Sequence, residues 1–482
     1  MNKFLNSFTQ KTSKTCLLFA LSLLFSSATW AAVNPLDLGD GSQSYFSPEK
    51  DKKMGERYFH YIRASNALLS DAVVTNYIEN LGQRLARATN NSKLSFHFFV
   101  VDDSNINAFT GPGGYIGVNS GLINMVNSQS ELAAVLAHEI GHVTQHHIAL
   151  AMQRAKAMRF PSLVLAAAAV AIGAKNPDVG AGALAATEGG MYQNILNFSR
   201  ENESEADHAG VRLLYRANFD PEQMPRLFQR MQKIENLYPA DIPEYLQTHP
   251  MDDKRIADTE NLAARYPKKQ YPSDPDFPFI HARIRIATGN DLYANKNYFQ
   301  NKMTSYPNDL SYRYGYALSL LNLRQTQLAR TEIDGLLRQA PNNLLFLLAK
   351  ANQQTIANQL PQAVLTLKQA YKINPHYYPV VFAYAITLVS AHNGNAEPFI
   401  AEQIKNYPHQ QKLYYLLAKA QANRGENVRS HESLAKYLAM AGADNQALAQ
   451  FQIAQNLSHG ANEEKVHLKE EIKKLQEKMA ES

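Results

Sequence analysis

The sequence predicts two folded parts: a mixed α+β domain that is mostly helical, and after it an array of helices alone. Helical periodicity in the first half is interrupted near residue 94 by an aromatic and β-branched run, which indicates a strand. From residue 278 onward the strand signals stop, and prolines recur at a nearly constant interval. The 482 residues suffice for two or three domains, and a composition that is 45% hydrophobic and 19% charged excludes a disordered or collagen-like chain.

The first 31 residues predict a cleaved signal peptide. Three lysines precede the short apolar run Cys16–Phe25, and small residues follow it. The run is too short to span a bilayer, and the small residues place the cleavage after Ala31, with cleavage after Ala28 as an alternative. An uncleaved membrane anchor would keep the same compartment, and a lipoprotein is disfavoured because polar residues stand directly before Cys16. We therefore expect an exported protein.

Two counts exclude further classes. Cys16 is the sole cysteine, so that the mature chain is expected to form no disulfide. The formal net charge is only +5, which argues against a nucleic-acid partner bound through bulk charge.

Local patterns predict the elements of the first domain, residues 48–270, which follows a linker at 32–47. Helices are expected at 50–66, 71–88, 131–158 and 199–216, and strands at 94–101 and 115–118. Ser128 and Glu131 have the spacing of a capping box and mark the start of the third helix. Glycines and a proline at 107–114 predict a turn.

The segment 160–190 contains small apolar residues at 163–174 and then a stretch rich in Gly, Asn, Pro and Asp. Its apolar part is too short to cross a membrane as a helix. Two interpretations stay open: a buried helix that leads into a loop, or a flap that touches a membrane or an unfolded client.

The second half contains an internal repeat. Four prolines recur at intervals of 34, 34 and 33 residues: Pro307, Pro341, Pro375 and Pro408. This period is typical of tetratricopeptide repeats, in which each helix pair ends at a proline. The sequence predicts such an array over 278–456, followed by a charged C-terminal helix over 457–482. A generic helical bundle is the alternative.

The residues from His138 to His142 read H-E-I-G-H, the pattern H-E-x-x-H, within the third predicted helix. Histidines four residues apart lie on one helix face, so that both imidazoles can bind one Zn²⁺ ion. Glu139 is placed where it can take a proton from a water molecule at the metal. Two unrelated histidines on a solvated helix are the alternative, but chance produces the pattern only ~0.02 times in such a chain.

A catalytic zinc site needs a third protein ligand and an open position. The extended motif with a third nearby histidine is excluded, because Gln145 and Ile148 stand where its glycine and that histidine are required. The third ligand must therefore be remote, and Glu203 in the acidic segment 200–207 is the best candidate. Asp207 shares its helix face and could orient a ligating histidine. Spacing alone does not decide between Glu203 and the neighbouring carboxylates.

Four further side chains near these motifs are expected in solvent. Glu201 and Glu205 lie on other faces of their helix. His146 and His147 follow the histidine motif by one turn, and we expect both to be exposed.

The motif H-E-I-G-H with a downstream E-x-x-A-D resembles the gluzincin-type metallopeptidases that include HtpX and the CAAX prenyl proteases. The segment 107–116, which contains Asn-Ala-Phe and Pro-Gly-Gly-Tyr-Ile, and Gly121-Leu122 resemble the strand segment before the zinc helix in that family. With a signal peptide, no predicted transmembrane helix and a repeat array, the chain is most similar to the periplasmic β-barrel assembly-enhancing proteases, the BepA type. The likeness extends over nearly the whole mature chain.

This resemblance implies a zincin-like metallopeptidase fold for the first domain and one Zn²⁺ ion per chain. It implies zinc ligation by His138, His142 and Glu203, with Glu139 as catalytic base. It also implies Asp207 as a supporting acid or proton donor.

His249-Pro250, with Arg255 six residues after the histidine, resembles a second element of these proteases. The resemblance suggests that His249 approaches the metal. There it would fill the open coordination position at rest or donate a hydrogen bond to the oxyanion, with Arg255 aiding charge stabilisation. A loop histidine and a solvated arginine are the alternative.

The resemblance implies a periplasmic zinc endopeptidase of a Gram-negative bacterium that degrades misfolded or stalled outer-membrane proteins and assists their assembly. A concave repeat array could select clients or dock the β-barrel assembly machinery, and peripheral contact with a membrane is expected if 160–190 forms the flap described above. We expect the strand at 115–118 to hold an extended substrate by edge pairing. A non-catalytic tetratricopeptide chaperone or adaptor with a structural zinc site is the alternative, and an aminopeptidase is disfavoured because no acidic pocket for a free amine is evident.

Overall fold

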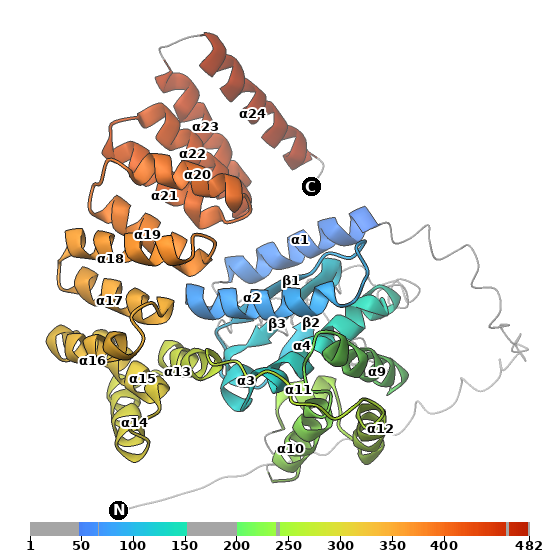
Figure 1. The fold of residues 1–482 in the computed structure, drawn as a ribbon. Coiled ribbons are helices and arrows are strands. Elements are labelled where there is room, and N and C mark those ends of the chain that lie inside the picture. Colours follow the sequence, from blue (N-terminus) through green and yellow to red (C-terminus); the bar gives the residue numbers. More distant parts are fainter. Residues whose placement is uncertain (1–47, 66, 152–199, 238–241, 459–461, 481–482) are drawn as a thin grey trace, which may run out of the picture. The chain divides into compact units, whose positions relative to one another are not determined.

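The computed structural model describes residues 48–480 except for 66, 152–199, 238–241 and 459–461. The predicted signal peptide, the linker at 32–47 and the segment 160–190 therefore lie outside the described residues. A mixed part with a small sheet is followed along the chain by helices alone (Figure 1). The predicted fold class, a mostly helical α+β domain before an all-α solenoid, is confirmed. Within the described ranges, no helix has both the length and the apolar character needed to cross a membrane.

The helices of the first part are α1 (Pro48–Ala64), α2 (Ala72–Arg87), α3 (Ser120–Met125), α4 (Gln129–Thr144), α9 (Arg200–Arg216), α10 (Gln223–Leu237), α11 (Glu244–Thr248) and α12 (Asp253–Ala263). Of the four helices predicted from the sequence, α1, α2 and α9 have nearly the predicted bounds. The start of α4 is as predicted, because the Ser128 hydroxyl accepts a hydrogen bond from the backbone N–H of Glu131 at 3.2 Å.

The prediction that this helix continues to residue 158 was wrong. α4 ends at Thr144, and the chain becomes helical again at 147–151. His146 between them has a φ of 57°, in the left-handed region where a right-handed helix cannot continue. Apolar periodicity continues across this break, because the spacing of apolar residues does not depend on the φ angle of one residue. The sequence pattern therefore could not predict where α4 ends.

The sheet has three strands: β1 (His97–Val101), β2 (Ala108–Thr110) and β3 (Tyr115–Asn119). β3 lies in the middle, parallel to β1 and antiparallel to β2. The sequence did not predict β2, because three residues inside a turn cluster show no alternation. The expectation that 115–118 pairs with substrate as an edge was also wrong, since β3 is paired with β1 on one side and with β2 on the other, and the outer strands are β1 and β2.

Both faces of this sheet are buried, because side chains alternate between them along a strand. Phe98 and Val100 of β1 belong to the main core, which also contains residues of α2 and α4. Phe99 and Val101 face the other way and pack with Tyr58 of α1. α4 lies inside this part: every residue from Glu131 to His142 is buried. The polar residues of the H-E-x-x-H motif are therefore held in the protein interior.

The second part consists of helices whose successive members pack against one another. They are α13 (Phe277–Thr288), α14 (Leu292–Ser305), α15 (Leu310–Asn322), α16 (Thr326–Gln339), α17 (Leu344–Ile356), α18 (Leu360–Ile373), α19 (Tyr378–Ser390), α20 (Ala396–Asn406), α21 (Gln411–Asn423), α22 (Asn427–Met440), α23 (Asp444–Leu457) and α24 (Asn462–Ala480). Each of the four periodic prolines lies in the connection just before α15, α17, α19 or α21.

The repeat is visible in the backbone as well. A residue with positive φ ends the first helix of each pair, at the same intervals as the prolines: Arg324, Asn358, His392 and Gly425. The backbone N–H that follows each of them bonds back across the turn, as in Gln325 N to Leu320 O at 2.8 Å. Identical turns at a constant period are what an array of equivalent helix pairs requires.

Candidate metal centre

The site forms where α4 and α9 approach closely. A Cβ added at Gly141 would lie only 2.8–2.9 Å from backbone atoms of Ala206, so that the glycine of the H-E-I-G-H motif is needed for contact between the two backbones. Gly210 has the same role one turn further along α9, because a Cβ there would lie 3.2 Å from the backbone nitrogen of His138. This approach brings the carboxylates of α9 to the histidines of α4.

The two motif histidines and Glu203 lie together. The Nε2 atoms of His138 and His142 are 3.0 Å apart. One carboxylate oxygen of Glu203 is 3.4 Å from His138 Nε2, and the other is 3.5 Å from His142 Nε2. All three side chains are at most 2% exposed.

His249 completes the group. Its Nδ1 atom lies 2.9 Å from a Glu203 oxygen and 3.4 Å from His138 Nε2, and its side chain is buried. One donor atom from each of His138, His142, Glu203 and His249 lies within 4.8 Å of the other three. Imidazole nitrogens with one carboxylate are a donor set that Zn²⁺ prefers, and converging buried donors are costly unless a cation or protons share them. The residues therefore fit a metal ion, and His249, although it lies in the connection before α12 as the alternative expected, is buried within this group.

Glu139 is fully buried beside this group. One of its carboxylate oxygens accepts a hydrogen bond from the Thr110 hydroxyl at 2.8 Å. The other oxygen has no hydrogen-bond partner among the described residues and lies 3.7 Å from His249 Nε2. Thr110 belongs to the outer strand β2, so the strand that the sequence did not predict also orients the predicted base.

Asp207 and Arg255 lie behind His138. Asp207 Oδ1 is 2.9 Å from His138 Nδ1, the ring nitrogen opposite Nε2, and Arg255 binds both oxygens of Asp207 at 2.8 Å. Burial raises the pKa of the Asp207 carboxyl, but the charge of Arg255 and the hydrogen bond from His138 outweigh it and hold the pKa below its usual value. This environment favours a carboxylate that orients His138 over a proton donor.

Arg255 is itself only 6% exposed, which excludes the solvated arginine considered from the sequence. Its Nη1 atom also lies 2.9 Å from a Glu203 oxygen. The backbone N–H of Arg255 is capped by the side chain of Asp252, which fixes the start of α12. Arg255 therefore holds two carboxylates of α9 at once, a role that its sequence position did not reveal.

The expectations for the neighbouring side chains were partly wrong. His146 and Glu201 are exposed, as expected. His147 is fully buried instead, with its Nδ1 atom 2.9 Å from His142 Nδ1 and its Nε2 atom 3.1 Å from Glu205. Glu205 is 61% exposed but reaches inward to this histidine. The left-handed residue at 146 turns the chain back toward α4, which no helical extrapolation would show.

Comparisons with known proteins agree with this geometry. The model of peptidase family M48 matches residues 72–263, the range that contains all of these side chains. The chain is 31% identical to the β-barrel assembly-enhancing protease of Yersinia pestis, over 86% of this chain and 85% of that protein. It is 35% identical to the putative β-barrel assembly-enhancing protease of Vibrio cholerae, over 69% of each chain. The mitochondrial metalloendopeptidase OMA1 of Schizosaccharomyces pombe is 30% identical over 42% of this chain and 56% of its own length.

The shared range begins at α2, ends with α12 and includes the histidine motif, the α9 carboxylates and His249. The similarity to the bacterial proteases continues through most of the helical array. The chain is therefore a metallopeptidase of family M48, and it belongs to the family of the β-barrel assembly-enhancing proteases.

Proposed function

We propose that this chain is a periplasmic zinc endopeptidase that cleaves misfolded or stalled outer-membrane β-barrel proteins and assists their assembly. The observation that carries the proposal is the buried group of His138, His142 and Glu203 with Glu139 beside it. The client class is supported by the names of the relatives, which are similar over 85% of their length. Export is supported by the signal-like first 31 residues.

The arrangement suits hydrolysis of a peptide bond. His138, His142 and Glu203 would hold the Zn²⁺ ion, which when bound would supply Lewis-acid activation of water and of the scissile carbonyl. Glu139 accepts the proton of the attacking water and delivers it to the nitrogen of the leaving amine. Asp207 Oδ1 lies 2.9 Å from His138 Nδ1, so that a proton on Nδ1 faces this carboxylate and Nε2 is left as the ligand atom.

His249 bears on the resting state of this enzyme. Its Nδ1 atom lies 2.9 Å from a Glu203 oxygen and its Nε2 atom 3.7 Å from a Glu139 oxygen, so that it would fill the position that an active zinc site needs open. In our proposal this is a closed state, and His249 withdraws when substrate binds. The five-residue helix α11, which ends at His249, is short enough to move as a unit.

The outer strand β2 is the surface we assign to the substrate backbone. It pairs with β3 along one edge only, and its Thr110 contacts Glu139 directly. An extended segment that pairs with β2 would pass beside the base, and backbone pairing recognises such a segment without demanding a particular sequence. This assignment replaces the one made for 115–118.

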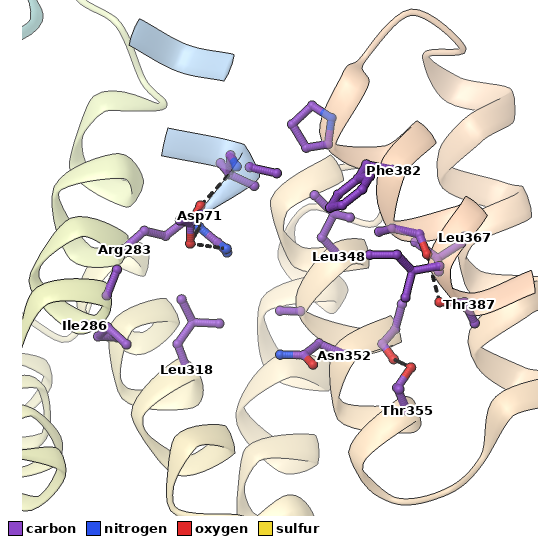
Figure 2. A pocket seen from close by; sticks show the side chains of 18 of the residues that line it. Asp71, Arg283, Ile286, Leu318, Leu348, Asn352, Thr355, Leu367, Phe382 and Thr387 are labelled. Carbon is purple, nitrogen blue, oxygen red and sulfur yellow. Dashed lines mark hydrogen bonds and ion pairs between the residues drawn. The ribbon is translucent and has the colours of Figure 1, made fainter. Parts of the chain in front are cut away.

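The repeats offer a second binding surface. A pocket of about 420 Å³ lies between the start of α2 and the helices α13, α15, α17, α18 and α19 (Figure 2). Most of its lining is apolar, as at Ile286, Leu318, Leu348, Leu367 and Phe382, and the exposed amide of Asn352 adds a polar group. Apolar walls with a few polar groups suit an extended client segment. We place the β-barrel assembly machinery on the remaining surface of the array.

The proposal is tested by measuring zinc content and casein cleavage together, for the mature protein and for Glu139→Gln. We expect one equivalent of zinc in both proteins and cleavage by the native protein alone. Cleavage of a substrate with a blocked N-terminus distinguishes an endopeptidase from an aminopeptidase. Recovery of the protein in a periplasmic fraction, with a mature N-terminus after residue 31, tests the export.

Zinc without cleavage in either protein would leave a self-blocked enzyme or a non-catalytic adaptor. The buried His249 beside the ligand group is the observation that favours the non-catalytic adaptor as the second candidate function. His249→Ala decides between them: activity that appears in this variant indicates self-blocking, and continued inactivity with bound zinc indicates the adaptor.

A further inference from the structure

His147 is a buried histidine that the peptidase mechanism leaves unused. Its side chain is fully buried, although its neighbour His146 is exposed. Its Nδ1 atom lies 2.9 Å from His142 Nδ1, on the side of the His142 ring that faces away from Glu203 and His138. Its Nε2 atom lies 3.1 Å from Glu205 Oε2.

A specific backbone reversal creates this contact. In an uninterrupted helix, residues five apart point to different faces, so His147 could not stack behind His142. The left-handed conformation of His146 ends α4, and a helix begins again at residue 147. This reversal places His147 against His142 in the last turn of α4. Only a few non-glycine residues adopt this conformation readily, which indicates that the surrounding structure holds the turn in place.

The three side chains permit one consistent arrangement of hydrogen atoms. If His142 binds metal through Nε2, its Nδ1 carries a proton and must donate it. His147 Nδ1 is then the acceptor, so that the proton of His147 is on Nε2. This Nε2–H donates to the carboxylate of Glu205. In this arrangement His142 donates to His147 and His147 donates to the exposed Glu205, so that the chain of hydrogen bonds leads from the metal site to the protein surface.

We propose that His147 is a positioning residue for the metal ligand His142, and that Glu205 fixes its tautomer. The inference rests on the proposed metal site. His147 would have the same position behind His142 that Asp207 has behind His138, but His147 is neutral and lies just beyond the end of α4. Partners of this kind set the ring orientation and the basicity of a ligating histidine, and their loss costs roughly 10–100-fold in metal affinity.

The test compares two amide substitutions in the Glu139→Gln background, which prevents self-cleavage. The amide oxygen of His147→Asn stands close to the place of the histidine Nδ1 atom and can accept the hydrogen bond from His142. In His147→Gln the amide stands close to the place of Nε2 and cannot. His146→Asn is the matched control, because it changes the adjacent exposed histidine and asparagine tolerates a positive φ.

Zinc dissociation constants are measured by competition with a chelator. We expect His147→Gln to weaken zinc binding by roughly 10–100-fold, whereas His147→Asn and His146→Asn stay close to the parent. Equal affinity for all four proteins, or equal loss in the Asn and Gln variants, would overturn the proposal. A role in packing alone predicts such equality, because both amides leave the site underfilled.

Two further measurements keep the outcome separate from folding and from the proposed function. The melting temperature of each metal-free variant reports packing, and the rise on adding zinc reports binding. The inference is supported if the metal-free melting temperatures of His147→Asn and His147→Gln fall equally, while the rise in melting temperature on adding zinc becomes smaller in His147→Gln alone. If the parent binds zinc but neither the native protein nor His249→Ala cleaves casein, the proposed function fails, and the ranking of zinc affinities still tests His147.

Discussion

Glu139, the general base of the proposed mechanism, is oriented by a residue from a different element. Thr110 on β2 donates to one oxygen of Glu139, and the second oxygen faces the ligand group. A carboxylate can take a proton efficiently only when one oxygen is held within hydrogen-bond reach of the reacting water. At the scale of single residues, the site therefore depends on a hydroxyl outside the zinc motif.

Replacing Thr110 with Val keeps its shape and removes this hydrogen bond. A hydrogen bond to a charged group contributes about 1.5–3 kcal/mol, so we expect kcat for casein cleavage to fall roughly 10–100-fold with zinc content unchanged. Thr110→Ser is the matched control, because it keeps the hydroxyl and should retain most of the activity. Unchanged kcat in Thr110→Val would show that Glu139 is held by its backbone and packing alone.

At the scale of elements, α11 is the link between the strand segment and His249. Its Tyr245 N–H bonds to the carbonyl of Ile106, and the neighbouring Glu244 faces Asp103 and Asn107. Burial and the charge of Asp103 raise the pKa of the Glu244 carboxyl to about 7, against the smaller effect of a hydrogen bond from Asn107. Burial therefore favours the protonated form of Glu244 at the start of α11.

This pKa predicts a loss of stability with rising pH. The folded-state pKa of Glu244 is above the ordinary value of 4.5, so its stabilising effect is complete below about pH 4.5 and is lost as pH rises to about 7. We expect Glu244→Gln, which keeps a neutral side chain, to be more stable than the native protein at pH 8 by about 1–2 kcal/mol. The two proteins should be similar at pH 4.5.

The measurement is the urea midpoint of both proteins between pH 4.5 and 8. The exposed Glu402 supplies the control, since Glu402→Gln should leave the pH dependence of the native protein unchanged. A constant difference between native protein and Glu244→Gln across this range would contradict the assignment.

At the scale of the whole molecule, Asp71 is one of the residues that join the peptidase part to the repeats, as Arg63 does through Gln411 and the carbonyl of Met440. Asp71 caps α2 by accepting from the N–H groups of Val73 and Val74, and it also forms an ion pair with Arg283 of α13 at 2.7 Å. Arg283 donates in turn to the Tyr314 hydroxyl of α15. Figure 2 shows Asp71 and Arg283 meeting at the wall of the pocket. The pocket therefore depends on a contact that both parts of the chain supply.

Asp71→Ala removes the cap and leaves Arg283 without this carboxylate. Both side chains are partly buried, at 17% and 14% exposure, so the loss costs less than the about 3–5 kcal/mol of a fully buried pair, and we expect a melting temperature several degrees lower. Asp71→Asn should lower it less, because asparagine caps a helix well. Asp291→Ala is the control: Asp291 caps α14 with the same geometry but forms no ion pair with the described residues. Equal effects of Asp71→Ala and Asp291→Ala would mean that only the cap matters.

Short-range patterns determined much of this protein. The spacing of four between His138 and His142 follows from the helical period, and the recurring prolines mark the real boundaries of helix pairs. Glu203 shows the limit of such patterns. Spacing alone did not decide between Glu203 and the neighbouring carboxylates as the third metal ligand, and the family resemblance selected Glu203. Its contact with the histidines depends on the approach of α4 and α9 at Gly141.

Only the tertiary structure decided the surroundings of the site. Thr110 and His147 carry no local signature, and the element that marked Arg255 did not reveal which residues it binds, because each of the three acts on a residue brought close by packing or by a single backbone reversal. Sequence periodicity reports which face of an element is apolar, and so it locates ligands that share one helix. The partners that orient those ligands come from other elements or from beyond a break in the helix, and their positions exist only once the chain has folded.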